Sequence, residues 1–152
     1  MQAYRLIKAR YASDPLDPQG AKRYGGRWNS KGKAVLYAAD SISLAALELL
    51  VHLHRSTILN HYVLVTVELP DKAILTLDNQ ALPPDWRDDP PPRSTQTLGD
   101  GWLSSQQSLA LAVPSTVVPQ QYNLVINPAH PAFPTLAETL TSTPFLFDQR
   151  LA

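Results

Sequence analysis

The sequence predicts an α+β fold in a single domain that covers residues 1–152. Short β-branched or apolar runs recur along the chain, whereas only one segment has the length and composition of an uninterrupted helix. Most of the 14 prolines follow position 69, which favours short elements joined by stiff loops in the second half. A chain of 152 residues also has the size of one compact domain.

Several segments have the composition of strands, and most of them are apolar and bounded by turn residues. The apolar run 61–69 predicts a central strand. Residues 73–77 predict a second, shorter strand or an irregular edge, and the tail with its three phenylalanines predicts one more strand or a docking segment. The remaining predicted strands are residues 3–9, 34–38, 109–113 and 122–127.

The clearest predicted helix covers residues 42–54, because this segment is rich in Leu and Ala and contains no Gly or Pro. Asp40 or Ser41 can cap it. Apolar residues surround most of its circumference, which predicts a helix covered on several sides. A shorter helix is predicted to begin at Ser94 or Thr95 and to reach Gln107, although two glycines weaken it. Between the two, residues 82–93 carry five prolines and predict a flexible loop.

The composition excludes several classes of function. The 13 basic and 13 acidic residues cancel, so no global charge favours direct binding to nucleic acid or to an anionic membrane. The absence of cysteine excludes disulfides and thiolate chemistry. Neither a signal peptide nor a stretch of about 18 apolar residues is present, so we expect a cytoplasmic protein.

The sequence also lacks the motifs of common metal and nucleotide sites. No two of the four histidines share a helix face at ligand spacing, so no metal site is predicted. The glycines of residues 20–32 match neither a phosphate loop nor a dinucleotide fingerprint, and no nucleophile elbow occurs. Kinase, dehydrogenase and serine hydrolase activities therefore have no support.

Residues 20–33, which we call the basic bend, combine four glycines with five cations. The glycines permit tight or left-handed backbone. Tyr24 and Trp28 lie between the cations, and guanidinium groups beside aromatic faces suit a planar base attached to phosphates. The alternative is a solvated basic turn whose aromatic side chains pin it to the core. Composition favours neither interpretation.

Four polar residues outside the excluded motifs suit the cleavage of an N-glycosidic bond. They are Arg27 in the basic bend, Tyr37 on a strand, Glu48 on the helix and Ser115 between two prolines. A base leaves ribose through an oxocarbenium-like state, which a nearby carboxylate stabilises. An arginine can hold phosphates by paired hydrogen bonds, a tyrosine can stack on the base, and a serine can fix the carboxylate or a ribose hydroxyl.

Each of these four residues also has a structural interpretation. Arg27 can stack on a neighbouring aromatic ring, and Glu48 can belong to a solvated helix face together with His52. Tyr37 can be an ordinary half-buried strand tyrosine, while a serine after proline commonly serves only its turn. Residue types alone leave both sets of interpretations open.

Short motifs spread over nearly the whole chain favour the functional interpretation of Arg27 and leave the two interpretations of the other three residues open. The motifs comprise residues 4–5 (YR), 20–21 (GA), 24–30 (YGGRWNS), 35–38 (VLYA), 47–52 (LELLVH), 114–115 (PS) and 123–131 (NLVINPAHP). By these motifs the chain resembles the RES-domain family, which is named for an Arg, a Glu and a Ser. In this sequence they fall on Arg27, Glu48 and Ser115.

The resemblance implies the toxin of a type II toxin–antitoxin system, paired with an Xre-type antitoxin, that depletes NAD. The implied reaction cleaves the nicotinamide–ribose bond by hydrolysis or phosphorolysis, with NAD as substrate and no cofactor. The implied fold is similar to ADP-ribosyltransferases, with two small, mostly antiparallel sheets forming a cleft and helices packed around them.

The resemblance also assigns roles to residues. Arg27 would contact phosphate or ribose, Tyr37 the nicotinamide side, and Glu48 would be the catalytic carboxylate with Ser115 supporting it. Neighbours of the arginine in the basic bend would bind substrate, namely Tyr24, Gly26, Trp28 and Asn29.

Two alternative functions stay open at this point. The chain can instead be an ADP-ribosyltransferase that modifies a protein, which needs the same pocket and an acceptor surface. It can also be a non-catalytic module that binds a nucleotide or only an antitoxin. The sequence does not determine the acceptor, whether the chain forms a homodimer, how the antitoxin blocks the site, or what loop 82–93 does.

Overall fold

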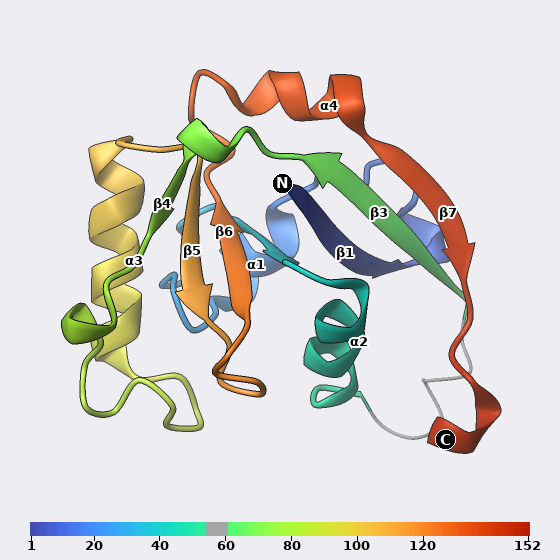
Figure 1. Cartoon of the computed structure of the whole chain (residues 1–152), viewed down its shortest axis with the longest axis horizontal. Helices are drawn as coiled ribbons and strands as arrows, with labels where there is room; N and C mark the ends of the chain where they lie inside the picture. The colour runs from blue at the N-terminus through green and yellow to red at the C-terminus, as the bar shows by residue number, and fades with distance from the viewer. Residues whose placement is uncertain (54–60) are drawn as a thin grey trace.

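The computed structural model describes residues 1–53 and 61–152. It confirms the predicted α+β class (Figure 1). The helices are α1 (Gln19–Tyr24), α2 (Ile42–Leu50), α3 (Arg93–Ser105) and α4 (Leu136–Thr139). The strands are β1 (Gln2–Lys8), β2 (Leu36–Ala39), β3 (Tyr62–Glu68), β4 (Ile74–Thr76), β5 (Ala110–Pro114), β6 (Tyr122–Ile126) and β7 (Thr141–Phe145). Within the described residues, each helix is too short or too polar to span a bilayer.

The strands form one seven-stranded sheet in the order β4-β5-β6-β2-β1-β3-β7. All neighbouring strands are antiparallel except β4 and β5. Strands β2 and β1 pair through the single register Tyr4 with Ala39, whereas β1 pairs with β3 over its full length. The two small sheets that were expected are therefore two parts of one sheet with a narrow junction. Figure 1 shows α2 beside this junction, between the β5–β6 part and the β3–β7 part.

Strand β3 confirms the strand predicted at residues 61–69, but it lies one place from the end of the sheet, between β1 and β7. Its buried residues are Tyr62, Val65 and Val67, and the side chains between them are partly covered. The apolar run is therefore continuous because both faces of β3 are at least partly buried, and not because β3 lies in the middle of the sheet.

The main core lies on β2, β5 and β6. All five residues of β5 are buried, which agrees with the apolar composition of residues 109–113. Leu36, Leu124 and Ile126 are almost inaccessible and pack in one cluster. This part of the sheet forms a rigid support for the polar residues at its ends.

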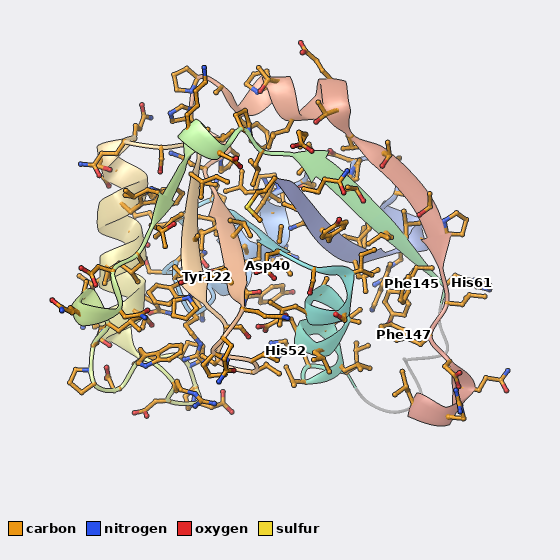
Figure 2. The ribbon with its side chains drawn as sticks, in the orientation of Figure 1. Asp40, His52, His61, Tyr122, Phe145 and Phe147 are labelled. Carbon is orange, nitrogen blue, oxygen red and sulfur yellow. The ribbon has the colours of Figure 1, made fainter. Side chains whose placement is uncertain are left out.

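The tail after β7 packs on β3 through aromatic side chains. Phe147 is buried, and its ring meets Tyr62 at 5.5 Å and Phe145 at 5.1 Å in edge-to-face geometry. Figure 2 shows Phe145 and Phe147 side by side below the end of β7. Of the two alternatives predicted for the tail, the strand is confirmed as β7, and Phe147 after it packs on Tyr62.

Helix α2 begins as predicted and has one buried face. The Ser41 hydroxyl caps it by accepting a hydrogen bond from the Leu44 N–H at 3.1 Å. The prediction that this helix is covered on several sides is wrong, because the side chains of Ile42, Leu47 and Val51 are 40–58% exposed. The described helix ends at Leu50, and the predicted last residue, 54, lies outside the described residues.

Helix α1 was not predicted. It occupies the first half of the basic bend, where the sequence indicated a turn. Pro18 precedes its first residue, and Gly25 ends it with φ of +72° and ψ of 175°, a conformation that only glycine adopts readily. Six residues without an apolar period give no sequence signal for a helix.

Helix α3 confirms the second predicted helix, and one of its glycines has a packing role. A Cβ on Gly99 would lie 1.8 Å from the Trp28 carbonyl oxygen, so only glycine lets α3 reach the basic bend. Asp100 then accepts hydrogen bonds from the Ser30 N–H at 3.1 Å and from the Ser30 hydroxyl at 2.5 Å. The helix therefore holds the basic bend in place.

This contact predicts opposite effects for two substitutions in one helix. Gly99→Ala should lower the free energy of unfolding by about 3 kcal/mol or more, because the new methyl group overlaps backbone. Gly101→Ala is the control, since nothing lies within 4 Å of its position. It should raise the stability by about 0.5–1 kcal/mol through the better helix propensity of alanine. Urea unfolding of both variants measures this, and equal effects would contradict the packing role.

Candidate active site

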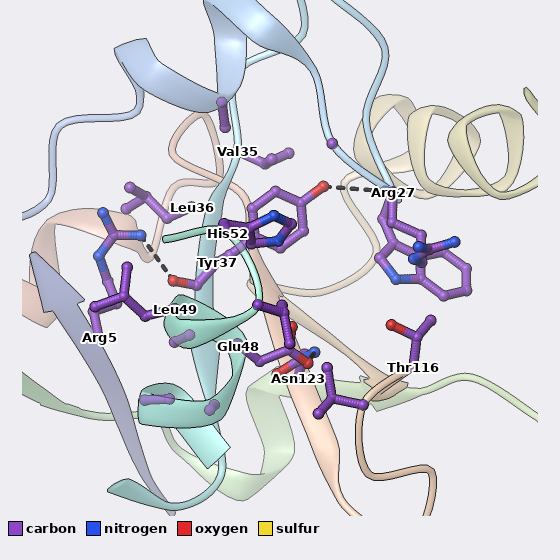
Figure 3. Close-up of a pocket in the computed structure, with 18 of the residues that line it drawn as sticks. Arg5, Arg27, Val35, Leu36, Tyr37, Glu48, Leu49, His52, Thr116 and Asn123 are labelled. Carbon is purple, nitrogen blue, oxygen red and sulfur yellow. Dashed lines mark hydrogen bonds between the residues drawn. The ribbon is translucent and has the colours of Figure 1, made fainter. Parts of the chain in front are cut away.

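A cleft of about 800 Å³ opens where the two parts of the sheet meet (Figure 3). It is lined by residues of β1, β2, α2, the basic bend, the loop 82–92 and the segment that follows β5. This volume lies within the range of pockets that bind small organic ligands. Arg27, Tyr37 and Glu48 all line it, so three of the four predicted catalytic residues share one cavity.

Glu48 is half-buried and rigidly held. Its Oε1 accepts hydrogen bonds from the Ser115 hydroxyl at 2.7 Å and from the Asn123 side-chain amide at 2.6 Å. Its Oε2 accepts none from the described residues. The carboxylate therefore has one anchored oxygen and one oxygen left for a ligand. The interpretation of Glu48 as part of a solvated helix face is excluded.

Ser115 holds this carboxylate and has no capacity left for another role. Its side chain is fully buried just after β5. Its Oγ accepts hydrogen bonds from the N–H groups of Val117 and Val118, both at 3.0 Å. A hydroxyl has two lone pairs and one proton, so the proton must point to Glu48. Ser115 is therefore a positioning residue, and it also serves its turn.

Tyr37 presents its ring to the cleft and buries its hydroxyl. The hydroxyl donates to Asn29 Oδ1 at 2.6 Å and accepts from the Trp28 N–H at 3.1 Å. Burial raises the pKa of the phenol well above its usual value near 10, and the Trp28 hydrogen bond opposes this only in part. The hydroxyl is therefore neutral near pH 7 and structurally satisfied.

Arg27 faces the cleft and fastens the loop 82–92. Its Nη1 donates to the carbonyl oxygens of Trp86 at 2.9 Å and Asp88 at 2.7 Å. Its Nε and Nη2 make no hydrogen bond to the described residues. The partners of Arg27 are thus carbonyls rather than the aromatic rings of its own bend, and donors remain for an anion.

The four predicted substrate-binding residues divide into two pairs. Gly26 and Trp28 line the cleft, and a Cβ on Gly26 would lie 2.7 Å from the Tyr37 hydroxyl. Asn29 is fully buried and holds the bend, because its amide donates to the Ala21 and Lys33 carbonyls. Tyr24 is 71% exposed and is not among the described residues that line the cleft.

Sequence reasoning missed two residues of the site. Asn123, the second residue of the apolar strand β6, donates to Glu48. Arg5 on β1 lines the cleft, and its Nη1 donates to the Tyr37 carbonyl at 2.8 Å. Burial lowers the pKa of Arg5 to about 10, and its Nε is buried without a partner among the described residues. For Asn123 the available signal was a lone polar residue inside an apolar strand, whereas Arg5 lies on a strand that also carries Gln2 and Lys8 and so left no such signal.

These side chains surround a space that can hold a nucleotide. Figure 3 shows Glu48 and Asn123 near Tyr37, with Arg27 and Thr116 on one side of the tyrosine and Arg5 on the other. The cleft thus presents cations on both sides of one fixed carboxylate. In the described part of the chain, no group of three or more His, Asp or Glu side chains is arranged to hold a metal ion.

Comparison with known proteins identifies the family. The RES domain matches residues 2–148. The chain belongs to the RES-domain family. This confirms the resemblance found in the sequence motifs.

Curated relatives share the family over most of the chain. The protein "Toxin Res" of Yersinia enterocolitica is 44% identical over 151 residues, covering 99% of each chain. "Toxin Res" of Photorhabdus laumondii is 36% identical over 151 residues, covering 99% of this chain and 97% of the relative. A relative from Sphingobium, called "Prs ADP-ribosylating toxin", is 44% identical over 125 residues, covering 80% and 77% of the two chains.

A solved structure has the same fold. A chain in the crystal structure of the M. tuberculosis MbcT–MbcA toxin–antitoxin complex matches this RES domain with a TM-score of 0.76 and 23% identity. The match covers 95% of this chain and 84% of the other. The overall fold is therefore shared with that chain.

The buried phenol of this RES domain predicts a pH dependence of stability. The folded-state pKa of Tyr37 is raised, so its contribution to stability is complete below the unfolded value near 10 and is lost as the pH rises above it. The unfolding free energy should fall faster for the wild type than for Tyr37→Phe, by up to about 1.4 kcal/mol per pH unit. Urea titrations between pH 9 and 11 measure this. Parallel curves for the two proteins would contradict a buried, neutral Tyr37.

Proposed function

We propose that this chain is the toxin of a toxin–antitoxin pair and that it cleaves the nicotinamide–ribose bond of NAD. The observation that carries the proposal is the fixed carboxylate of Glu48, with one free oxygen, in the same cleft as Arg27. Membership of the RES-domain family supports the toxin role.

The proposed chemistry needs a carboxylate and no proton donor to the leaving group. When the bond between ribose C1′ and the nicotinamide nitrogen breaks, its electron pair stays on nicotinamide, which leaves as a neutral molecule. The ribose then carries positive charge, and Glu48 Oε2 stabilises this charge across a short distance. An oxygen of the acceptor bonds to C1′, and where that oxygen carries a proton the proton passes to solvent. The neutral, fully bonded Tyr37 hydroxyl is compatible with this scheme.

The other residues of the cleft bind and orient the substrate in this proposal. Arg27 holds a phosphate or ribose oxygen through its unused donors, at about 1.5–3 kcal/mol for a charged hydrogen bond. The ring of Tyr37 stacks on nicotinamide. Ser115 and Asn123 fix the angle of the carboxylate, so that no reorganisation is needed during the reaction.

Three acceptors fit the same site: water, phosphate or a side chain of a protein. The third acceptor makes the chain an ADP-ribosyltransferase, and the relative named as a Prs ADP-ribosylating toxin supports this second candidate. NAD labelled in its adenosine part separates the two functions. Transfer leaves label on a protein, whereas hydrolysis or phosphorolysis leaves it in small molecules.

The partner in this proposal is an antitoxin of the Xre type, and the site of action is the cytoplasm. The similar solved structure is a toxin–antitoxin complex, which supports an antitoxin partner. The Xre type is implied by the sequence resemblance alone. An antitoxin that covered the cleft mouth or the basic bend would stop the reaction, because NAD could no longer enter.

The first test of the proposed function removes the charge of Glu48 and keeps its shape. In Glu48→Gln the amide oxygen can still accept from Ser115 and Asn123, so the fold should persist. Release of nicotinamide from NAD should fall about 100- to 1000-fold, because the stabilising charge is lost. Glu138→Gln is the control, since Glu138 is an exposed residue of α4.

Both proteins are assayed in phosphate and in phosphate-free buffer. Full activity of Glu48→Gln would overturn the role of the carboxylate. The absence of nicotinamide release by micromolar wild-type protein in both buffers would overturn cleavage to small-molecule products and leave transfer to a protein or a binding module.

The second test concerns the support of the carboxylate. Ser115→Ala removes one of the two donors to Glu48 and the acceptor of two N–H groups. Nicotinamide release should fall about 10- to 100-fold, less than for Glu48→Gln, and stability should drop by about 1–3 kcal/mol. Ser104→Ala, an exposed position of α3, should behave like the wild type. Activity of Ser115→Ala equal to that of Ser104→Ala would show that Ser115 serves only the turn.

A further inference from the structure

We infer that Arg87 is a second substrate-binding cation and that it makes the cleft select a dinucleotide, with its diphosphate, over a mononucleotide. The inference rests on the proposed function for the identity of the reaction. Arg87 lies in the loop 82–92, which had no assigned role in the sequence. It lines the cleft together with Arg27.

The guanidinium of Arg87 is held in place but retains donors. Its Nη2 donates to the Thr116 carbonyl at 2.8 Å, and the group lies 5.8 Å from the centre of the Trp86 ring. Its Nε and Nη1 make no hydrogen bond to the described residues. None of the ion pairs in the described part of the chain involves Arg87 or Arg27. Both positive charges are therefore uncompensated by a salt bridge.

The two arginines are tied to one short backbone segment. Arg27 Nη1 bonds to the carbonyls of Trp86 and Asp88, the residues on either side of Arg87. Arg87 in turn bonds to the carbonyl of Thr116, the residue after Ser115. The Arg27 guanidinium is thus bonded to the backbone on both sides of Arg87, and the Arg87 guanidinium is bonded to the turn after β5, which keeps both cations beside the same segment.

This segment also fixes the side of the cleft on which the charges lie. Figure 3 shows Arg27 and Thr116 on the same side of Tyr37, and Arg5 on the other. Since Arg87 is bonded to Thr116, the cations Arg27 and Arg87 flank the same side of the carboxylate. A substrate whose glycosidic bond lies at Glu48 would extend its phosphates toward them.

The charge of a dinucleotide matches this pair. Its two linked phosphates carry one negative charge each, and one guanidinium can pair with each phosphate through planar, paired hydrogen bonds. A mononucleotide has a single phosphate, which Arg27 alone can satisfy. Because the arginines are already fixed by backbone carbonyls, little side-chain freedom is lost on binding.

The alternative role for Arg87 is structural, as an anchor of the loop to the turn at Thr116. Arg87→Gln separates the two roles, because a glutamine amide can donate to the Thr116 carbonyl but has no charge. Arg87→Ala removes both features. Arg93→Ala is the matched control, since Arg93 is an exposed arginine at the start of α3 that does not line the cleft.

The experiment compares NAD with nicotinamide mononucleotide, which has the same glycosidic bond and one phosphate. Arg87→Gln and Arg87→Ala should each raise the KM for NAD about tenfold or more, with kcat within about twofold of the wild type. The KM for the mononucleotide should stay within about twofold in all proteins. Arg93→Ala should match the wild type with both substrates.

Two kinetic results would overturn the inference. A wild-type KM for NAD in Arg87→Gln, with a raised KM in Arg87→Ala, would leave Arg87 as a structural anchor only. An equal rise for both substrates would remove the selection of a diphosphate.

Calorimetric titration with ADP-ribose, which contains the diphosphate but no nicotinamide, tests the inference independently of catalysis. Weaker binding by Arg87→Gln than by Arg93→Ala supports it even if no protein releases nicotinamide, a result that would overturn only the proposed reaction. Equal affinity in these two variants contradicts it.

Discussion

One carboxylate oxygen, Oε1 of Glu48, joins the helix beside the sheet junction to the strands that carry the rest of the site. It receives a hydrogen bond from Ser115 after β5 and another from Asn123 in β6. A half-buried carboxylate needs such donors, because burial without them is costly. The same two bonds fix the direction of the free oxygen.

The basic bend owes more of its composition to structure than its charges suggest. Asn29 is a buried hub for the bend, and Gly99 of α3 is required for contact with the Trp28 backbone. Only Arg27 carries the charge of the bend into the cleft, and it also anchors the loop 82–92. Both interpretations of this segment therefore hold in part: it is a structural turn with one arginine available to an anion.

Local patterns predicted most of the elements, and the misses have physical causes. An apolar run such as β5 and a capped helix start such as Ser41 leave strong local signals. The six-residue helix α1 leaves none. The junction of the two sheet parts at Tyr4 and Ala39 depends on contacts between distant segments, so two sheets were expected where one exists. The sequence likewise could not show which side of α2 stays uncovered.

The site was predictable to a similar extent. Residue types and the family resemblance pointed to Arg27, Tyr37, Glu48 and Ser115, and the structure brings these four side chains together. Composition could not separate residues that face the cleft from neighbours that hold the backbone, as Asn29 shows. Asn123 and Arg5 were overlooked because their hydrogen-bond partners, Glu48 and the Tyr37 carbonyl, come from other parts of the chain.

The most direct test of the account is a crystal structure of the Glu48→Gln variant with NAD. The account predicts the dinucleotide in the cleft, with ribose C1′ of the nicotinamide half against the side chain at position 48 and the phosphates at Arg27. NAD bound elsewhere, or bound with this ribose turned away from position 48, would contradict it.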